Sequence, residues 1–495
     1  MTGSNRRRHF AAGALTPAPI KNRKGDVQPP LKTPFDGSTL KSAWSTTYEA
    51  KSARQLASVI LLKVDSRQAY ADILLDRALK ATELNERDRA LLTELTYGTL
   101  RWRGNIDARL SRQLRRPLAD TDEFIRNLLR VTVYQLLFLD KIPDYAAVNE
   151  AVELAKRQCG AKSAGFVNGV LRSLLRQKDR TAQASNRSNA SRAEEFSHPE
   201  WLVERWIDEF GVSEASALMR ANNQKAPLVL RANRLKCSRE QLRERLLAQG
   251  VIASASEWSP EGIVLESAGN VEKLPGYADG LFQIQGESSQ LIAYLLAPEP
   301  RERILDACAA PGGKSCHIAE LMNDSGTVIA LDSSARGVER IRENVARLNL
   351  RSIDPTQADV TKELSGVYCQ PYDRVLIDAP CSGLGTLRAH PEIKWRRQAS
   401  DLERLSQLQR KILQRVVHYL RPGGTLVYST CTITRDENDA IVETFLAQHK
   451  EFELEDAARY LPEPARHMVR GKYFQALPHR DNTDGFFAAR LRKVY

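Results

Sequence analysis

The chain has 495 residues, 27% of them charged, and a formal net charge of +12 at pH 7. This length exceeds one ordinary core, and about 150 residues per domain suggests roughly three domains. No apolar run is long enough to span a bilayer, and the N-terminus lacks the apolar core of a secretory signal. We therefore expect no membrane segment. Seven cysteines without paired spacing argue against a disulfide framework, so we expect a cytoplasmic protein, and its positive charge favours polyanions such as nucleic acid.

The first 177 residues divide into two parts by composition. Residues 1–45 are rich in proline, glycine, lysine and arginine, and we expect a disordered basic leader there. In residues 46–177, apolar side chains recur at helical spacing, as in ARQLASVILLKV, and Asn85 is placed to cap a helix. No strand pattern interrupts this stretch, so the sequence predicts an all-α domain.

The middle of the chain mixes helix and strand patterns. Residues 178–195 are polar with almost no large apolar side chains, which is typical of a linker. Within 196–300, LVLRANRL and GIVLES indicate strands, and SREQLRERLLAQG indicates a helix that ends near Gly250. The sequence predicts a small α+β domain here.

From 301 to 495 the alternation of strands and helices becomes regular. RILDACA, TVIALD, RVLIDAP and GTLVYSTC have the apolar, β-branched character of buried strands, and helical patterns separate them. Strands buried on both faces and joined by helices predict a doubly wound parallel sheet of the α/β class.

A glycine-rich loop, CAAPGGKS, follows the first of these strands. Its end, residues 313–315, matches a nucleotide-triphosphate loop. Cys308 stands where that loop has its first glycine, however, and Pro311 spoils the nest of backbone N–H groups that binds phosphate. Ligands of such sheets bind beyond the carboxyl ends of the strands. The loop therefore favours a nucleoside ligand without phosphates.

Three acidic residues follow the next three strands. Asp332 is placed to accept hydrogen bonds from ribose hydroxyls. Asp359 is equally compatible with a contact to an adenine ring and with a simple cap of its own loop. Asp378 would hold magnesium in the phosphate-loop alternative, but it also precedes a Pro-Cys pair and a glycine-rich turn, which packing does not explain.

Two cysteines, Cys381 and Cys431, follow neighbouring strands, and we expect both thiols to face the ligand crevice. No CxxC or Cys/His cluster indicates a metal site, so we predict none. The remaining cysteines are expected to be ordinary buried side chains: Cys159, Cys237, Cys316 and Cys369.

These motifs together resemble a known family. DACAAPGGK, LD, AD, IDAPCSG and STCT, in this order, resemble the RNA cytosine-C5 methyltransferases. ERDRALLTELTYGTLRW, GFVNGVLR, HPEWLVERW and DGFFAARLRK resemble the bacterial 16S ribosomal RNA members, which carry a NusB-like N-terminal domain. The resemblance implies a NusB-like RNA-binding domain at 46–177, an RNA-recognition domain at 196–300 and a Rossmann-like methyltransferase domain at 301–495.

The resemblance also implies a role for each site residue. Cys431 matches the nucleophile, and Cys381 matches the second cysteine that helps to release the product. From the chemistry of the base, we also expect Asp378 to be able to contact the cytosine edge, besides its cofactor role. We expect Lys314 to add positive potential that favours a thiolate. The residues that match positions binding S-adenosyl-L-methionine are Cys308, Ala309, Ala310, Pro311, Gly312, Gly313, Lys314, Asp332, Asp359 and Asp378. Ser315 stands where the family usually has threonine, which preserves the hydroxyl.

The implied partner is 16S ribosomal RNA, and we expect a monomer without an obligate protein partner. Candidates to contact the RNA backbone, each equally a solvated charge, are Arg101, Arg103, Arg115 and Arg116. A non-catalytic NusB-like RNA-binding or antitermination factor would need neither cysteine. A DNA cytosine methyltransferase uses the Pro-Cys thiol as its nucleophile, which the additional STC motif disfavours, and a nicotinamide dehydrogenase lacks its GxGxxG here.

Overall fold

The computed structural model describes residues 52–67, 69–177, 188–266 and 269–495. The predicted leader at 1–45 and residues 178–187 of the predicted linker lie outside these ranges. Across the described part of the chain, none of the helices combines the length and the apolar character needed to cross a bilayer.

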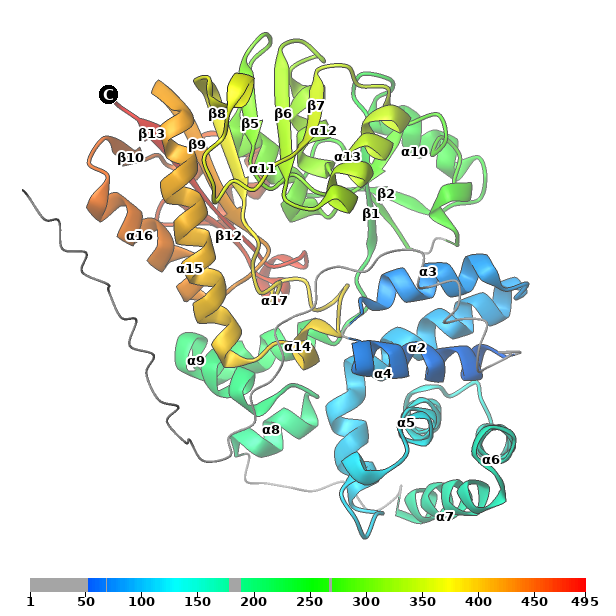
Figure 1. Cartoon of the computed structure of the whole chain (residues 1–495). Coiled ribbons are helices and arrows are strands. Elements are labelled where there is room, and N and C mark those ends of the chain that lie inside the picture. The colour runs from blue at the N-terminus through cyan, green and yellow to red at the C-terminus, as the bar shows by residue number, and fades with distance from the viewer. Residues whose placement is uncertain (1–51, 68, 178–187, 267–268) are drawn as a thin grey trace, which may run out of the picture. The chain divides into compact units, whose positions relative to one another are not determined.

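The N-terminal part is all-α, as predicted. Its helices are α2 (Ala53–Arg67), α3 (Ala71–Ala81), α4 (Glu86–Ser111), α5 (Glu123–Phe138), α6 (Asp144–Cys159) and α7 (Ala161–Gln177) (Figure 1). The Asn85 side chain accepts the N–H of Asp88 at 2.9 Å, which confirms the predicted cap of α4. Buried Arg130 of α5 contacts Asp65 of α2 and Asp107 of α4, at 2.7 Å each, and so ties three helices together.

Two helices lie between the all-α part and the strands of the middle domain. The end of the predicted linker forms α8 (Asn189–Glu195), and α9 (Glu200–Asn222) comes next. Their buried side chains, Trp206 among them, cluster with Leu384, Leu387 and Leu477 of the C-terminal part. The prediction of linker up to 195 is therefore wrong for 189–195, because its few apolar residues find partners far away in the sequence.

A four-stranded antiparallel sheet in the order β2-β3-β1-β4 forms the middle of the chain. Its strands are β1 (Leu228–Ala232), β2 (Ala253–Ala255), β3 (Gly262–Leu265) and β4 (Phe282–Ile284), and α10 (Arg239–Leu247) packs on it. The predicted strands and the predicted helix are all present.

The C-terminal part contains a nine-stranded sheet in the order β11-β12-β13-β9-β8-β5-β6-β7, with β10 also paired to β13. The parallel strands are β5 (Arg303–Asp306), β6 (Thr327–Asp332), β7 (Ile353–Gln357), β8 (Tyr372–Asp378) and β9 (Leu420–Thr430). The antiparallel strands are β10 (Phe452–Leu454), β11 (Val469–Arg470), β12 (Tyr473–Ala476) and β13 (Phe486–Lys493). The sheet is therefore mixed, although a parallel sheet was predicted. The C-terminal strands pair antiparallel to one another and to β9.

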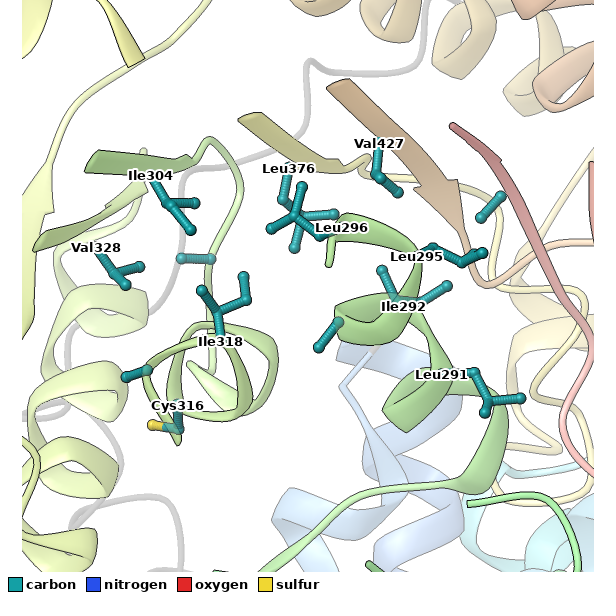
Figure 2. Packing of buried hydrophobic residues seen from close by; sticks show 14 of the residues in the cluster. Leu291, Ile292, Leu295, Leu296, Ile304, Cys316, Ile318, Val328, Leu376 and Val427 are labelled. Carbon is teal, nitrogen blue, oxygen red and sulfur yellow. The ribbon is translucent and has the colours of Figure 1, made fainter. Parts of the chain in front are cut away.

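Helices cover both faces of this sheet. One face carries α11 (Glu287–Leu296), α12 (Gly313–Leu321) and α13 (Ala335–Leu348), and the other carries α15 (Ala399–Val416) and α16 (Asp439–Gln448). Side chains alternate between the faces, so Ile304 packs with the first layer and Leu305 with the second. Figure 2 shows α11 packed beside Leu376 and Val427, so this helix, predicted within 196–300, belongs to the core of the large sheet.

The strand order places the site. β5 has β6 on one side and β8 on the other, so the connections after β5 and β8 leave the sheet in opposite directions. Such a switch point opens a crevice at the carboxyl ends of the strands, where ligands bind in open α/β sheets. Each predicted site residue follows, or ends, one of these strands.

Candidate active site

A cavity of about 490 Å³ lies at this edge of the sheet. It is lined by most of the residues that the sequence singled out: Cys308, Ala310, Asp332, Asp359, Asp378, Cys381 and Cys431. Five further predicted residues do not line it: Ala309, Pro311, Gly312, Gly313 and Lys314. The fold thus brings together side chains from five strand ends that are up to 123 positions apart, from Cys308 to Cys431.

The glycine loop shapes one wall of the cavity. Gly312 has a φ of 97° at the beginning of α12, and a Cβ there would lie 3.2 Å from the Cα of Ile341 in α13. Glycine therefore allows both the left-handed turn and the close approach of α13. Ser315, one turn into α12, donates its hydroxyl hydrogen bond to Asp306 at 2.6 Å, and burial raises the pKa of Asp306 to about 7.

Asp332 connects the loop to the second strand. Its Oδ2 accepts the N–H of Ala310 at 3.3 Å, and its Oδ1 accepts the N–H of Ser334 at 2.8 Å. A Cβ at Gly337 would lie 2.5 Å from Oδ1, so glycine at that position is what lets α13 pass beside the carboxylate. The carboxylate is thus held in place on the cavity wall, as a ribose-binding acid requires.

Asp359 lies two residues beyond β7 and forms the predicted cap of its own loop. The hydroxyl of Thr361 donates to it at 2.7 Å and the N–H of the same residue at 3.0 Å. These bonds, led by the one from the hydroxyl, lower the pKa of Asp359 below its ordinary value. Asp359 therefore caps its own loop while it also lines the cavity.

The cation of Lys314 is paired. Its Nζ lies 2.6 Å from Oδ2 of Asp378 and 5.0 Å from the centre of the Phe486 ring. The hydroxyl of Ser429 donates to the other oxygen of Asp378 at 2.9 Å. The expectation that Lys314 supplies free positive potential to a thiolate is therefore wrong, because the neighbouring carboxylate offsets its charge. Lys314 instead orients Asp378.

The two predicted thiols meet. The Sγ atoms of Cys381 and Cys431 lie 3.3 Å apart, on loops that leave β8 and β9. The hydrogen bond with Cys431, and then burial, raise the pKa of Cys381 well above its ordinary value. Burial, and then the charge of Asp306, do the same for Cys308. Two of the three cavity cysteines are therefore held as neutral thiols.

Backbone hydrogen bonds through two glycines, Gly385 and Gly485, hold the loop that carries Cys431. The N–H of Gly385 donates to the carbonyl of Cys431 at 3.1 Å, and the N–H of Gly485 donates to the carbonyl of Gly385 at 2.8 Å. A Cβ at Gly385 would lie only 2.0 Å from the oxygen of Gly485. The DGFF segment, which runs into β13, can therefore cross the CSGLGT loop only because both residues at the crossing are glycines.

Sequence reasoning missed several residues that support the thiols. Arg397 lines the cavity and donates to the carbonyls of Ser382 at 2.8 Å and Cys381 at 3.2 Å. Glu437 accepts hydrogen bonds from Ser382. Neither residue lies at a strand end, so position along the chain carried no signal for them.

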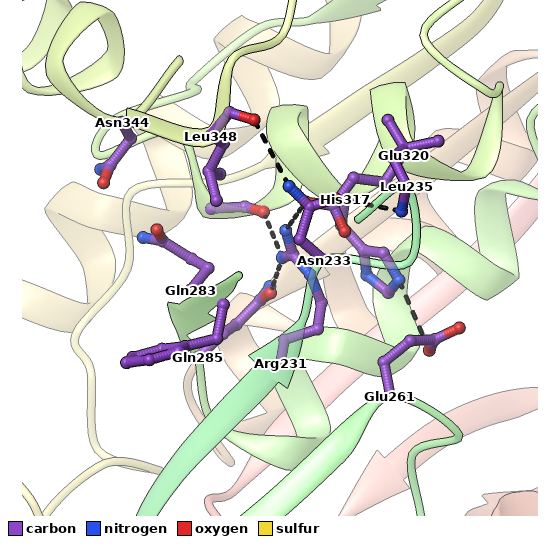
Figure 3. A network of polar contacts seen from close by, with 12 residues as sticks. Arg231, Asn233, Leu235, Glu261, Gln283, Gln285, His317, Glu320, Asn344 and Leu348 are labelled. Carbon is purple, nitrogen blue, oxygen red and sulfur yellow. Dashed lines mark hydrogen bonds and ion pairs between the residues drawn. The ribbon is translucent and has the colours of Figure 1, made fainter. Parts of the chain in front are cut away.

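The middle sheet supports the glycine loop from outside the cavity (Figure 3). Arg231 of β1 is fully buried, pairs with Glu320 of α12 at 2.6 Å, and donates to the carbonyl of Gly313 at 2.8 Å. Asn233 donates to the carbonyl of Leu348 at the end of α13 at 3.4 Å. One strand of the small sheet thus holds the first turn of α12 and the last turn of α13.

The helical part borders the cavity. Tyr70, just before α3, and His390 both line it. Buried Glu392 accepts the N–H of Ala71 at 3.2 Å, which caps α3 from a distant part of the chain. Asp72, His390 and Glu392 place possible metal-ligand atoms within 4.8 Å of one another, and this grouping stands alone among the described residues.

Two neighbouring side chains anchor this contact. Lys394 is buried and donates to the carbonyl of Arg101 at 2.9 Å and to Asn223 at 3.2 Å. The indole N–H of Trp395 donates to the carbonyl of Leu100 at 2.6 Å. Burial lowers the pKa of Lys394 well below its ordinary value. The segment between His390 and Arg397 therefore connects α4 to the loop that carries Cys381.

The arginines and the remaining cysteines differ partly from expectation. Arg101 is buried and Arg103 pairs with Asp65 at 2.8 Å, so neither presents a free charge to RNA. Arg115 and Arg116 are exposed, and both line a second cavity of about 820 Å³ beside α7. Of the four cysteines expected to be buried, only Cys316 is; the others are half-buried or exposed: Cys159, Cys237 and Cys369.

Three family models match separate parts of the chain. The model described as "16S rRNA methyltransferase RsmB/F" matches residues 293–492, the NusB family matches 51–176, and a ferredoxin-like domain of RsmF/B-like methyltransferases matches 198–272. These matches confirm the predicted order of a NusB-like helical domain, a mixed helix-and-strand middle domain and a methyltransferase domain.

Individual relatives match over most of the chain. "Probable ribosomal RNA small subunit methyltransferase B" of Bacillus subtilis is 39% identical, and the match covers 89% of this chain and 99% of that protein. "Ribosomal RNA small subunit methyltransferase B" of Pseudomonas syringae pv. tomato is 35% identical, with 89% and 97% covered.

Two solved structures are similar to this chain to different extents. The structure titled "Crystal Structure of PH0851" has a TM-score of 0.76 at 26% identity and covers 90% of this chain and 99% of its own. The structure titled "The crystal structure of NSun6 from Pyrococcus horikoshii with SFG" has a TM-score of 0.53 at 25% identity, covering 60% and 98%. SFG is an analogue of S-adenosylmethionine.

Proposed function

Because this chain belongs to the RsmB/F family of 16S rRNA methyltransferases, we propose that it transfers a methyl group from S-adenosyl-L-methionine to C5 of a cytosine in 16S ribosomal RNA. The observation that carries the cytosine-C5 assignment is the pair of thiols 3.3 Å apart in one cavity with Asp378. One thiol suffices for a nucleophile, and a second beside it provides a group for the later proton transfer.

The cavity residues fit the cofactor. Asp332, held by two backbone N–H groups, would accept the ribose hydroxyls, and Asp359 would lie beside the adenine. The glycine loop offers Ala310 to the same cavity. When bound, S-adenosyl-L-methionine supplies a methyl group on a sulfonium, which is reactive toward carbon nucleophiles.

Cys431 activates the base. C5 of cytosine is too weak a nucleophile to take a methyl group directly, and a thiolate that adds to C6 converts the ring to an enamine whose C5 is nucleophilic. Asp378, oriented by Lys314 and Ser429, contacts the amino and N3 edge of the ring. After methyl transfer, loss of the C5 proton reforms the C5–C6 double bond and expels the Cys431 thiolate.

Cys381 acts in this last step. In the free enzyme, the hydrogen bond with Cys431 is the largest cause that raises the pKa of Cys381. Once Cys431 is bonded to C6 as a thioether, that cause is gone, and the pKa of Cys381 falls. A larger share of Cys381 can then be present as the thiolate, the form that accepts a proton, at the stage where the C5 proton must leave.

The RNA is held outside the cavity. A cytosine reaches thiols at this depth only when it leaves its helix or lies in a loop. The NusB-like domain borders the cavity through Tyr70 and offers the exposed Arg115 and Arg116 elsewhere on its surface. Contacts of this kind bind folded RNA by its backbone and shape.

The test is methyl transfer from labelled S-adenosyl-L-methionine to a 16S ribosomal RNA transcript, followed by bisulfite sequencing. We expect one cytosine to resist conversion, and no cytosine to resist it with Cys431→Ala. Label on another base or on a ribose would overturn the C5 assignment. No transfer to naked RNA, to the small subunit or to its assembly intermediates would overturn the activity.

A further inference from the structure

Glu437 has no role in the chemistry above, yet its carboxylate is fully buried behind the thiols. It ends a short 3-10 turn, Arg435–Glu437, after β9. Its Oε1 accepts the N–H of Ser382 at 2.8 Å and the amide of Gln409 at 3.0 Å. Its Oε2 accepts the hydroxyls of Ser382 at 2.5 Å and Thr434 at 2.9 Å. Four donors satisfy a charge that would otherwise be costly to bury.

Ser382 follows Cys381 directly, and Thr432 follows Cys431. The hydroxyl oxygens of Ser382 and Thr432 lie 2.7 Å apart. A hydroxyl has one proton to donate, and Ser382 gives it to Glu437, so Thr432 must be the donor to Ser382. A chain of bonds therefore runs from the carboxylate through one cysteine loop to the other.

The next residue, Asn438, holds the second loop on both sides of its cysteine. Its Oδ1 accepts the hydroxyl of Thr430 at 2.5 Å, and its Nδ2 donates to the carbonyl of Thr432 at 3.1 Å. Glu437 thus binds the residue after Cys381, and Asn438 binds the residues on either side of Cys431. All of these side chains, the two thiols apart, are fully buried.

We propose that Glu437 and Asn438 are positioning residues that set how the thiols of Cys381 and Cys431 face each other and the cytosine. This inference rests on the proposed function for its consequence in catalysis, but the geometry of the thiols can be tested separately. A misplacement of about 1 Å costs on the order of 10²-fold in rate when two groups must act on the same reacting atoms.

The variants are made in the full chain. Glu437→Gln keeps the size but replaces one acceptor oxygen with an NH2 donor, which then faces two of the four donors. Ser382→Ala removes one hydroxyl and leaves the carboxylate three of its four bonds. The matched control is Glu443→Gln, an exposed glutamate on α16 that pairs with Arg435 at 3.4 Å.

Activity provides the first readout. We expect Glu437→Gln to lower kcat by ~10²-fold, with KM for RNA and affinity for S-adenosyl-L-methionine within about twofold of the parent. Ser382→Ala should lower kcat less, and Glu443→Gln should not change it. A kcat for both Glu437→Gln and Ser382→Ala equal to that of the control would overturn the proposal. The proposal would also be overturned if the loss of kcat disappeared when each variant was assayed equally far below its own melting temperature, because the loss would then reflect stability alone.

Thiol geometry provides the second readout and does not depend on the reaction catalysed. Diamide joins two adjacent thiols: a disulfide bond forms, both thiol protons leave, and the diamide is reduced to a hydrazine. Mass spectrometry measures the rate at which the Cys381–Cys431 disulfide forms. We expect this rate to fall in Glu437→Gln and Ser382→Ala but not in Glu443→Gln. Slower linkage without cytosine methylation by the parent enzyme would refute the proposed function alone, and equal linkage rates would refute the positioning.

Discussion

Lys314 Nζ lies 2.6 Å from Asp378 Oδ2 and so joins the first turn of α12 to the acid that ends β8. The two residues are 64 positions apart and lie on either side of the switch point between β5 and β8. Both are less than one-third exposed, at 11% and 26%. The contact makes the glycine loop and the Asp-Ala-Pro-Cys loop one unit, which the first prediction tests.

The first prediction concerns this pair. Lys314→Met and Asp378→Asn should each lower kcat/KM, and the double variant should lose less than the two single losses combined. Residues in direct contact couple by roughly 0.5–3 kcal/mol, and we expect a value inside that range. The control is Lys450→Met, an exposed side chain that does not line the cavity. Strict additivity in the double-mutant cycle would show that the contact is irrelevant to catalysis.

The second prediction separates the cysteines. Cys431→Ala should abolish methylation, because the loss of a covalent nucleophile approaches ~10⁶-fold in enzymes that depend on one. Cys381→Ala should still transfer a methyl group but accumulate a protein–RNA adduct, since the C5 proton then has no adjacent acceptor. The adduct is measured as a denaturant-stable band shift. Adduct formation by Cys431→Ala and none by Cys381→Ala would reverse the two roles.

The third prediction concerns the cofactor. Calorimetric titration should show that S-adenosyl-L-methionine binds without magnesium, and Asp332→Ala should weaken this binding because the ribose hydroxyls lose their acceptor. Glu339→Ala, an exposed residue of α13, provides the control. Magnesium-dependent binding of ATP, with none of S-adenosyl-L-methionine, would instead support the phosphate-loop alternative.

The fourth prediction is a pH dependence of stability. Burial raises the pKa of Asp306 from 3.8 to about 7, so the folded chain holds this proton more tightly than the unfolded chain. The contribution of Asp306 to the free energy of unfolding therefore falls as the pH rises from about 4 to about 7 and is constant above that. Asp306→Asn cannot ionise, so its free energy of unfolding in urea should fall less across this window. Parallel curves for both proteins would contradict the assignment.

The fifth prediction concerns RNA. Arg115→Ala combined with Arg116→Ala should raise KM for ribosomal RNA and reduce the salt dependence of binding by about one to two ions. The value of kcat and the affinity for S-adenosyl-L-methionine should not change, because both side chains lie on the second cavity, away from the thiols. A fall in kcat with unchanged KM would assign these arginines to catalysis instead.

Much of the architecture could be predicted from local patterns. Apolar, β-branched runs identified four of the five parallel strands, and the helical patterns predicted between them include α13. Two errors have one cause, which is contact with distant residues. The apolar side chains of α8 and α9 pack on Leu384 and its neighbours, and α11 packs on the large sheet. A pattern within twenty residues does not show which remote surface buries it.

The sequence alone determined which residues follow the strands, and hence that Asp332, Asp378, Cys381 and Cys431 share one edge of the sheet, because the carboxyl ends of parallel strands meet there. Only the tertiary structure decided how they are charged and held. Lys314 is paired with Asp378, and Glu437 binds the residue after Cys381. Hydrogen bonds and ion pairs form only when loops are placed to within a few tenths of an ångström. The spacing of residues along the chain does not specify positions that closely.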